Sequence, residues 1–288
     1  MTSMKCATPW CGGTDPLKLY RSFTREELER EYSPSSCLGG DISALIERYV
    51  AESAEARRTC RVHEDLPYGE APDEVLDLFL PQGPGPHPLH IFIHGGYWQE
   101  LSHKASAAMA PGLGARGIAL AVVNYTLAPD ATIAEMIDQC ARAIAWLQHH
   151  GADYGIDPDR ISLSGHSAGA QLAAMVLSQG CEGIASALLI SGIYDLEPLR
   201  HTYINEPLGL DAETARSMSP LFAADPPSCP VHVVVGENET SEFHRQSRTY
   251  AERLREEGRH VSHAVLEGLN HFDIILSDRI IEEIDGLA

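Results

Sequence analysis

The chain has 288 residues, and 44% of them are hydrophobic, enough to bury one large core. The formal charge of −20 comes without a basic cluster that could neutralise phosphates, which argues against a nucleic-acid partner and favours a soluble acidic protein. No apolar run reaches the roughly 18 residues of a membrane span, and the N-terminus lacks the apolar segment of a signal peptide, so we expect a cytoplasmic protein with no membrane partner.

The first predicted elements are helical. Residues 24–58 begin with a capping box at Thr24 and Glu27 and continue with apolar residues at helical spacing over 41–58. This pattern indicates an N-terminal helical cap. We therefore divide the chain into an N-terminal helical extension, residues 1–70, which packs on a catalytic domain formed by residues 71–288.

The rest of the chain predicts an α/β domain. Residues 74–80 alternate with period two, and the Pro- and Gly-rich segment 81–86 interrupts them, which suggests a hairpin edge leading to a strand at 89–93. Strand-like and helical segments then alternate, as expected for a mostly parallel central sheet with helices on both faces. Further strands are expected at 118–124, 160–164, 187–190, 231–235 and 260–266, and helices at 132–149, 171–177, 242–257 and from about 272.

The G-x-S-x-G pentapeptide at 165–169 follows one of these strands and opens a helix. This is the setting of the nucleophile elbow of an α/β-hydrolase fold, with Ser167 as the nucleophile. The serine occupies a sharp, strained turn, and side chains at Gly165 or Gly169 would collide with the crossing backbone. The pentapeptide alone would arise by chance in roughly one such chain in ten, so its placement carries the argument.

A base and an acid follow the serine in the chain order that this fold requires. His271 lies just after the final strand and before the last helix, where its loop covers the nucleophile, and we predict it to be the base. Glu239, in the loop after the strand at 231–235, is the predicted acid, because Glu237 lies too close to the strand end. Asp195, after the preceding strand, is the competing acid.

The loop at 94–98, with sequence HGGYW, is predicted to stabilise the oxyanion of a tetrahedral intermediate. Its glycines let the backbone approach the substrate, so the backbone amides of Gly96 and Tyr97 are the expected donors. The amide of Ala168, after the nucleophile, is the third.

Four side chains are candidates for substrate binding: Tyr97, Trp98, His166 and Phe272. Tyr97 and Trp98 could instead be ordinary core aromatics, but beside a flexible His-Gly-Gly they are expected to form a wall of the pocket. His94 and His166 flank the site and are expected to support the loop backbone.

We expect no cofactor and no metal. The chain has no phosphate loop and no H-E-x-x-H motif. Its seven cysteines are an odd number without C-x-x-C pairs, which argues against a disulfide framework and a structural zinc site. Cys6 and Cys11 form a C-x4-C pair, but two ligands without nearby partners are better interpreted as thiols of the N-terminal tail.

These motifs resemble the kynurenine formamidases (arylformamidases) and their esterase-like relatives among the α/β-hydrolases. HGGYW at 94–98 is the most specific of them, because broader lipases and esterases more often carry HGGG. Two departures are Glu239, where the family's acid is usually Asp, and Thr126, where relatives often have Arg. The elbow and the histidine loop at 270–273 are also specific enough to transfer roles, whereas the similarities at 32–34, 191–196 and 242–247 are less specific.

The resemblance implies hydrolysis of N-formyl-L-kynurenine to kynurenine and formate through a formyl-Ser167 intermediate, with His271 as base and then acid. The motifs alone support acyl transfer to water, so an esterase or amidase acting on another aromatic or secondary-metabolite substrate is an equal alternative. A non-catalytic ligand-binding relative is the third interpretation. The expected partner is a small-molecule substrate, and a homodimer is the default assembly.

Overall fold

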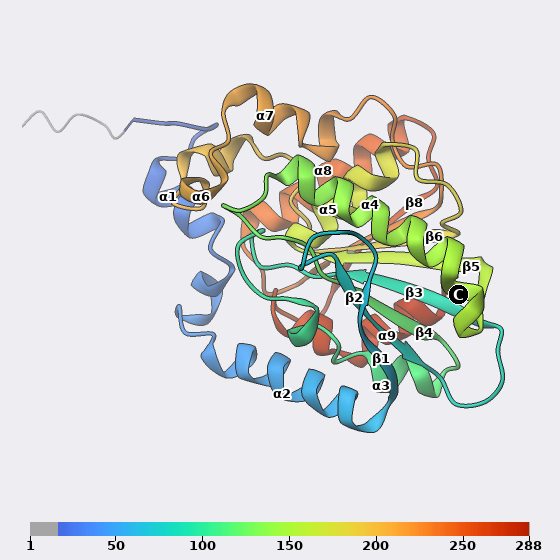
Figure 1. Cartoon of the computed structure of the whole chain (residues 1–288). Coiled ribbons are helices and arrows are strands. Elements are labelled where there is room, and N and C mark those ends of the chain that lie inside the picture. Colours follow the sequence, from blue (N-terminus) through green and yellow to red (C-terminus); the bar gives the residue numbers. More distant parts are fainter. Residues whose placement is uncertain (1–16, 288) are drawn as a thin grey trace, which may run out of the picture.

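The computed structural model describes residues 17–287, which form one eight-stranded sheet with helices on both faces (Figure 1). The strand order is β1-β2-β4-β3-β5-β6-β7-β8, and all neighbours from β4 to β8 run parallel, so the predicted mostly parallel sheet is confirmed. The strands are β1 (Arg61–Pro67), β2 (Val75–Leu80), β3 (His87–Ile93), β4 (Ala119–Val123), β5 (Ile156–His166), β6 (Ser186–Ile190), β7 (Val231–Gly236) and β8 (Val261–Leu266).

Helices fill most of the connections between the strands. The α-helices are α1 (Arg25–Glu31), α2 (Ser43–Thr59), α3 (Ala110–Ala115), α4 (Ile133–His150), α5 (Ala168–Ser178), α6 (Asn205–Leu208), α7 (Ala212–Ser217), α8 (Ser241–Glu256) and α9 (Asp278–Asp285). The short 3-10 helices are η1 (Pro34–Leu38), η2 (His103–Ala105), η3 (Gly151–Tyr154), η4 (Glu197–His201), η5 (Pro220–Phe222) and η6 (Asp273–Leu276).

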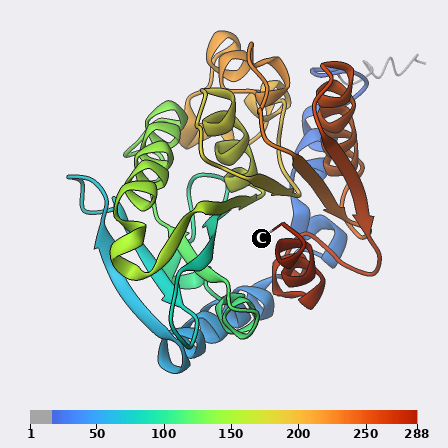
Figure 2. The ribbon, with the colours of Figure 1, turned by 90° about the vertical axis from the view of Figure 1, so that its right-hand side faces the viewer.

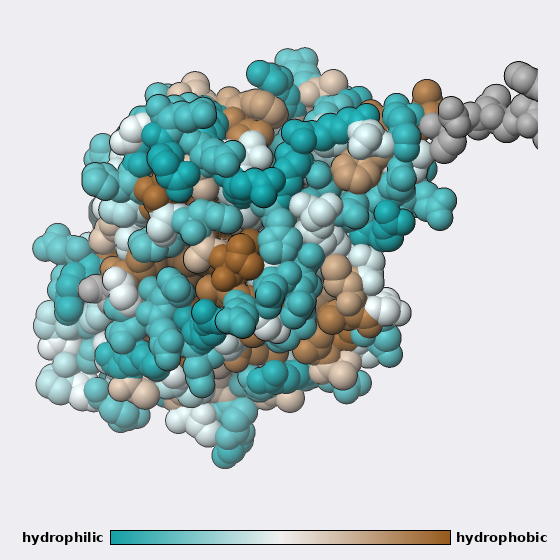
Figure 3. All heavy atoms as spheres, turned by 180° about the vertical axis from the view of Figure 1, so that it is seen from behind, coloured by the Kyte–Doolittle hydropathy of each residue, from teal (hydrophilic) through white to brown (hydrophobic). Residues whose placement is uncertain are grey.

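Helices cover both faces of the sheet (Figures 1 and 2), and the sheet separates two apolar cores. Alternate residues of a strand point to opposite faces, so Ile91 of β3 joins the core under α4, α5 and α8, and Phe92 joins the core under α2, α3 and α9. Hydrophilic side chains predominate on the surface seen from behind, and the hydrophobic patches there are small (Figure 3). Within residues 17–287 no helix has the length and apolar character to cross a membrane.

The N-terminal region differs from the sequence prediction in two ways. The helical segment 24–58 is divided at Ser33 and Pro34 into α1, η1 and α2, although the capping box of Thr24 and Glu27 is present as expected. Residues 61–67, assigned to the helical extension, form β1, whose mixed exposure gives no apolar alternation to detect. The division of the chain at residue 70 stays a prediction, and β1 pairs with β2 across it.

The expected hairpin between 74–80 and 89–93 is wrong. β2 pairs antiparallel with β1 and β4, and β3 lies between β4 and β5. The Pro- and Gly-rich connection therefore joins two strands that are not neighbours in the sheet. β4, which follows α3 in the sequence, lies between them. The last helical segment begins at Asp273, close to the expected position, but it is divided into η6 and α9.

The turn from β5 into α5 packs backbone directly against backbone. A Cβ atom at Gly165 would lie 2.1 Å from the Gly169 carbonyl oxygen, and one at Gly169 would lie 2.1 Å from the Ile93 carbonyl oxygen at the end of β3. Ser167, between the two glycines, has φ 56° and ψ −117°. Such a conformation costs on the order of 1–3 kcal/mol and persists only because the surrounding packing enforces it.

Gly169→Ala is expected to lower the free energy of unfolding by about 2–3 kcal/mol, because the elbow must move away from β3 to admit the methyl group. Gly114→Ala is the matched control, since its Cβ in α3 would meet no heavy atom within 4 Å. Urea unfolding followed by circular dichroism measures both variants. Equal stability of the two would contradict the close approach at Gly169.

His90 of β3 is buried in the seam between β3 and β5. Its Nδ1 lies 2.8 Å from Ser162 Oγ and its Nε2 lies 2.6 Å from Ser164 Oγ. Burial lowers the pKa of His90 to about 3. The folded protein therefore keeps this imidazole neutral over a pH range in which the unfolded chain, with a histidine pKa of about 6.5, takes up a proton.

Because the unfolded state binds the extra proton, this residue should make stability fall as the pH drops from about 6.5 towards 3. When the pH is lowered from 7 to 5.5, the free energy of unfolding of His90→Gln should fall by about 1 kcal/mol less than that of the wild type. Urea unfolding of both proteins at the two pH values is the measurement. An identical pH dependence in the variant would show that His90 does not contribute to it.

Candidate active site

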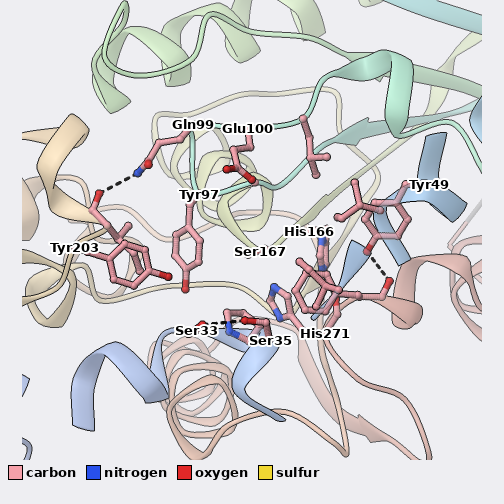
Figure 4. A pocket seen from close by; sticks show the side chains of 17 residues that line it. Ser33, Ser35, Tyr49, Tyr97, Gln99, Glu100, His166, Ser167, Tyr203 and His271 are labelled. Atoms are coloured by element: carbon pink, nitrogen blue, oxygen red, sulfur yellow. Dashed lines mark hydrogen bonds between the residues drawn. The ribbon is translucent and has the colours of Figure 1, made fainter. Parts of the chain in front are cut away.

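A cavity of about 200 Å³ lies at the carboxyl ends of the central strands and brings together residues from distant parts of the chain (Figure 4). Its wall includes the loop after β3, the elbow after β5, the loop after β8 and the segment around η1 and α2. The lining residues are Ser33, Pro34, Ser35, Ile42, Ile46, Tyr49, Gly96, Tyr97, Gln99, Glu100, Leu101, His166, Ser167, Tyr203, Ile204, His271 and Phe272.

The structure places His271 against Glu239 and not against Asp195. His271 Nδ1 lies 2.7 Å from Glu239 Oε2, and both side chains are buried. Asp195 instead accepts a hydrogen bond of 2.7 Å from the Tyr20 hydroxyl. With its Nδ1 proton donated to the carboxylate, His271 has Nε2 free to accept a proton inside the cavity that Ser167 also lines.

The second oxygen of the Glu239 carboxylate is also bonded. Oε1 accepts from the Ser191 hydroxyl at 2.6 Å and from the backbone amide of Gly236 at 2.7 Å. A buried carboxylate requires such partners, because leaving them out would cost several kcal/mol. The longer side chain of Glu, compared with the Asp usual in the family, therefore reaches His271 while remaining anchored at the ends of β6 and β7.

Two neutral histidines support the surrounding backbone. His166 donates from Nε2 to the His271 carbonyl oxygen at 2.8 Å, and burial holds the pKa of His166 well below its usual value. His94 donates from Nδ1 to the Gly95 carbonyl at 2.8 Å, and burial lowers the pKa of His94 to about 4. Its ring stacks on Tyr125, with centroids 4.4 Å apart. His166 thus supports the His271 loop, and His94 supports the loop after β3.

The loop after β3 lies directly against the elbow. A Cβ atom at Gly95 would be 2.8 Å from the His166 carbonyl oxygen and 3.1 Å from Ser167 Cβ. Gly96 has φ 101° and Tyr97 has φ 51°, and within residues 17–287 neither amide donates a hydrogen bond. Ala168 begins α5, so its amide lies at the positive end of that helix. The loop that carries Gly96 and Tyr97 therefore lies against the elbow, and Ala168 directly follows Ser167.

The four candidate substrate-binding side chains separate into two environments. Tyr97, His166 and Phe272 line the cavity. Trp98 does not: it is fully buried, and its indole N–H donates to Gln171 at 3.0 Å. Trp98 is therefore a core residue, the alternative that the sequence had left open.

Sequence reasoning missed several lining residues. Tyr49 belongs to an apolar helical pattern that indicated only packing, yet its hydroxyl donates to the Phe272 carbonyl at 2.5 Å and its ring lines the cavity. Tyr203, half exposed at 50%, follows no motif that could have identified it. Glu100 lies two residues beyond HGGYW, and that proximity was the available signal.

The N-terminal segment is fixed over the cavity by hydrogen bonds to the loops after β3 and β7. The Tyr97 hydroxyl donates to the Tyr32 carbonyl at 2.5 Å, and the Thr240 hydroxyl donates to the Glu31 carbonyl at 2.5 Å. The Tyr32 hydroxyl donates to Glu242, which also pairs with Arg245. In Figure 4, Ser33 and Ser35 accordingly form the side of the cavity opposite Gln99 and Glu100.

One cluster in the described part of the chain has the side chains for a metal ion. Ligand atoms of Asp65, Asp77 and His103 lie within 4.8 Å of one another, and none of these residues lines the cavity. The Lys104 ammonium lies 2.8 Å from Asp77, so a cation of the protein itself already neutralises this group. Cys6 and Cys11 lie outside the described residues.

Comparisons with known proteins agree with this architecture. A model of the prolyl oligopeptidase family matches residues 133–284, and the BD-FAE model matches residues 76–187. The kynurenine formamidase of Danio rerio is 36% identical, over 92% of this chain and 94% of its own length.

Solved structures of other proteins have the same fold as this chain. One from Silicibacter sp., provisionally described as a thioesterase, is 30% identical, covers 86% of this chain and 93% of its own, and has a TM-score of 0.78. Esterase B of Lactobacillus rhamnosis, 18% identical over 88% of this chain and 95% of its own, has a TM-score of 0.68 and shows the fold alone. The chain is a hydrolase, and it belongs to the kynurenine formamidase family of the α/β-hydrolases.

Proposed function

We propose that the protein hydrolyses the formamide of N-formyl-L-kynurenine to give kynurenine and formate, with Ser167, His271 and Glu239 as its catalytic triad. The observation that carries the proposal is a cavity in which the serine and the carboxylate-bonded histidine are surrounded by aromatic side chains. Tyr49, Tyr97, Tyr203 and Phe272 supply an apolar, flat-sided environment for an aryl group.

The reaction has two halves. Ser167 Oγ attacks the formyl carbon while His271 Nε2 accepts the hydroxyl proton, and the backbone amides of Gly96, Tyr97 and Ala168 stabilise the oxyanion. His271 then donates the proton to the aniline nitrogen as the C–N bond breaks, which releases kynurenine and leaves formyl-Ser167. Water, deprotonated by His271, hydrolyses this ester to formate and restores the serine.

The neutral state of His166 suits this mechanism. His166 and His271 lie with ring centroids 4.7 Å apart, so a positive charge on His166 would oppose the imidazolium that forms on His271. Burial removes that opposition, because it keeps the pKa of His166 low. Other properties, namely a cytoplasmic location, a homodimer and independence of cofactors, stay predictions from the sequence.

Glu239→Gln is expected to lower kcat by about 10³–10⁴, because a neutral amide can no longer fix the tautomer of His271 or stabilise the imidazolium. Asp195→Asn is the matched control and should lower kcat by less than about tenfold, since Asp195 contacts Tyr20 and not His271. Steady-state kinetics on a short-chain p-nitrophenyl ester would compare them. A larger loss from Asp195→Asn would overturn the assignment of the acid.

The substrate is tested with purified protein by following kynurenine release from N-formyl-L-kynurenine beside the cleavage of short-chain p-nitrophenyl esters. We expect kcat/KM for the formamide to exceed that for the esters, and Ser167→Ala to abolish both activities. A fluorophosphonate probe should label the wild type and not Ser167→Ala. Cleavage of esters alone would retain the serine mechanism and refute the formamide as substrate, and an unlabelled wild type would refute the serine mechanism itself.

A further inference from the structure

The charged groups around the cavity are unequally distributed. Among its described lining residues, Glu100 is the carboxylate, and neither Lys nor Arg is present. His166 is kept neutral by burial, and His271 is committed to Glu239. The cavity wall therefore complements a cationic group of a substrate and offers an anionic group no fixed positive partner.

Glu100 is held firmly at this wall by its backbone. Its amide donates to the Gly96 carbonyl at 2.9 Å, and a Cβ atom at Gly96 would lie 2.2 Å from the Glu100 carbonyl oxygen. Glu100 therefore belongs to the same tight turn that presents the Gly96 and Tyr97 amides. Figure 4 shows Glu100 on the side of the cavity opposite Ser33 and Ser35.

The Glu100 carboxylate has no partner within the described part of the protein. No ion pair or side-chain hydrogen bond joins it to residues 17–287, although most acidic groups near the cavity are paired: Glu239 with His271, and Glu242 with Arg245. An exposed glutamate is usually solvated surface. Glu100 differs because its backbone is fixed in the cavity wall, in the turn that carries Gly96 and Tyr97. Its carboxylate is not neutralised by another described residue.

We propose that Glu100 binds an ammonium group on the leaving-group side of the substrate, and that the enzyme prefers aryl amides that carry such a group over those that lack it. The inference rests on the proposed function and deepens it. In N-formyl-L-kynurenine everything except the formyl group belongs to the leaving group, including the α-ammonium. The α-carboxylate has no Lys or Arg partner among the described lining residues, so this proposal leaves it to be solvated by water near the half-exposed Tyr203.

The test compares formanilides that differ in charge: N-formylkynuramine, with an ammonium and no carboxylate, neutral ortho-formamidoacetophenone, and the deaminated acid of N-formylkynurenine. We expect wild-type kcat/KM to be about fivefold or more higher for the ammonium compound than for the neutral one, and lowest for the acid. In Glu100→Gln the ratio of ammonium to neutral compound should fall to about one. Glu213→Gln, an exposed charge change on α7, should keep the wild-type ratio.

The outcomes separate this inference from the proposed function. If the wild type hydrolyses the formanilides without preferring the ammonium compound, or if Glu100→Gln keeps the preference, Glu100 is not the recognition group and the proposed function stands. If no formanilide is hydrolysed, the proposed function fails. A matched ester pair, tyramine O-acetate against para-ethylphenyl acetate, then decides the role of Glu100: a preference lost in Glu100→Gln supports it, and an equal rate for both esters overturns it.

Discussion

Contact between two pieces of backbone determines where the other parts of the site lie. The turn after β5 can approach the end of β3 only because Gly169 has no side chain to meet the Ile93 carbonyl, and the same contact holds Ser167 in its strained conformation. Gly95 extends the contact to the other side, against His166 and Ser167. Ser167 and the amides that we propose to bind the oxyanion are therefore positioned by main chain rather than by adjustable side chains.

The positions of His271 and Glu239, the proposed base and acid, depend on a second constraint, the need to satisfy a buried carboxylate. Glu239 accepts hydrogen bonds from Ser191 after β6, Gly236 at the end of β7 and His271 after β8. Three neighbouring strand ends thus meet at one side chain. Breaking any of these bonds would leave a buried polar group partly unpaired, so the position of the imidazole is coupled to the sheet itself.

The parts that could be predicted from the sequence are those that a local pattern specifies. The G-x-S-x-G pattern at Gly165, Ser167 and Gly169 predicts a strained turn. The order of the strands then predicts that His271 and the loop of Glu239 lie above it. The predictions that were wrong concern features that depend on residues far apart in the sequence. The sequence pairs 74–80 with 89–93 because they are neighbours in the chain, whereas the insertion of β4 is a property of the whole sheet. Tyr97 and Trp98 are adjacent aromatic residues, so the sequence does not distinguish them. Tyr97 lines the cavity, whereas Trp98 is buried in the core and bonded to Gln171.

Two of the bonds that attach the N-terminal segment to the loops after β3 and β7 use only its main chain. Tyr97 and Thr240 donate to the carbonyl oxygens of Tyr32 and Glu31, which any residue at those two positions would present. The side chains that follow in this segment, such as Ser33, Ser35 and Ile42, face the cavity without carrying that attachment. Substitutions at these positions can therefore change which substrates fit the cavity, while the attachment of the segment and the strained turn at Ser167 stay intact.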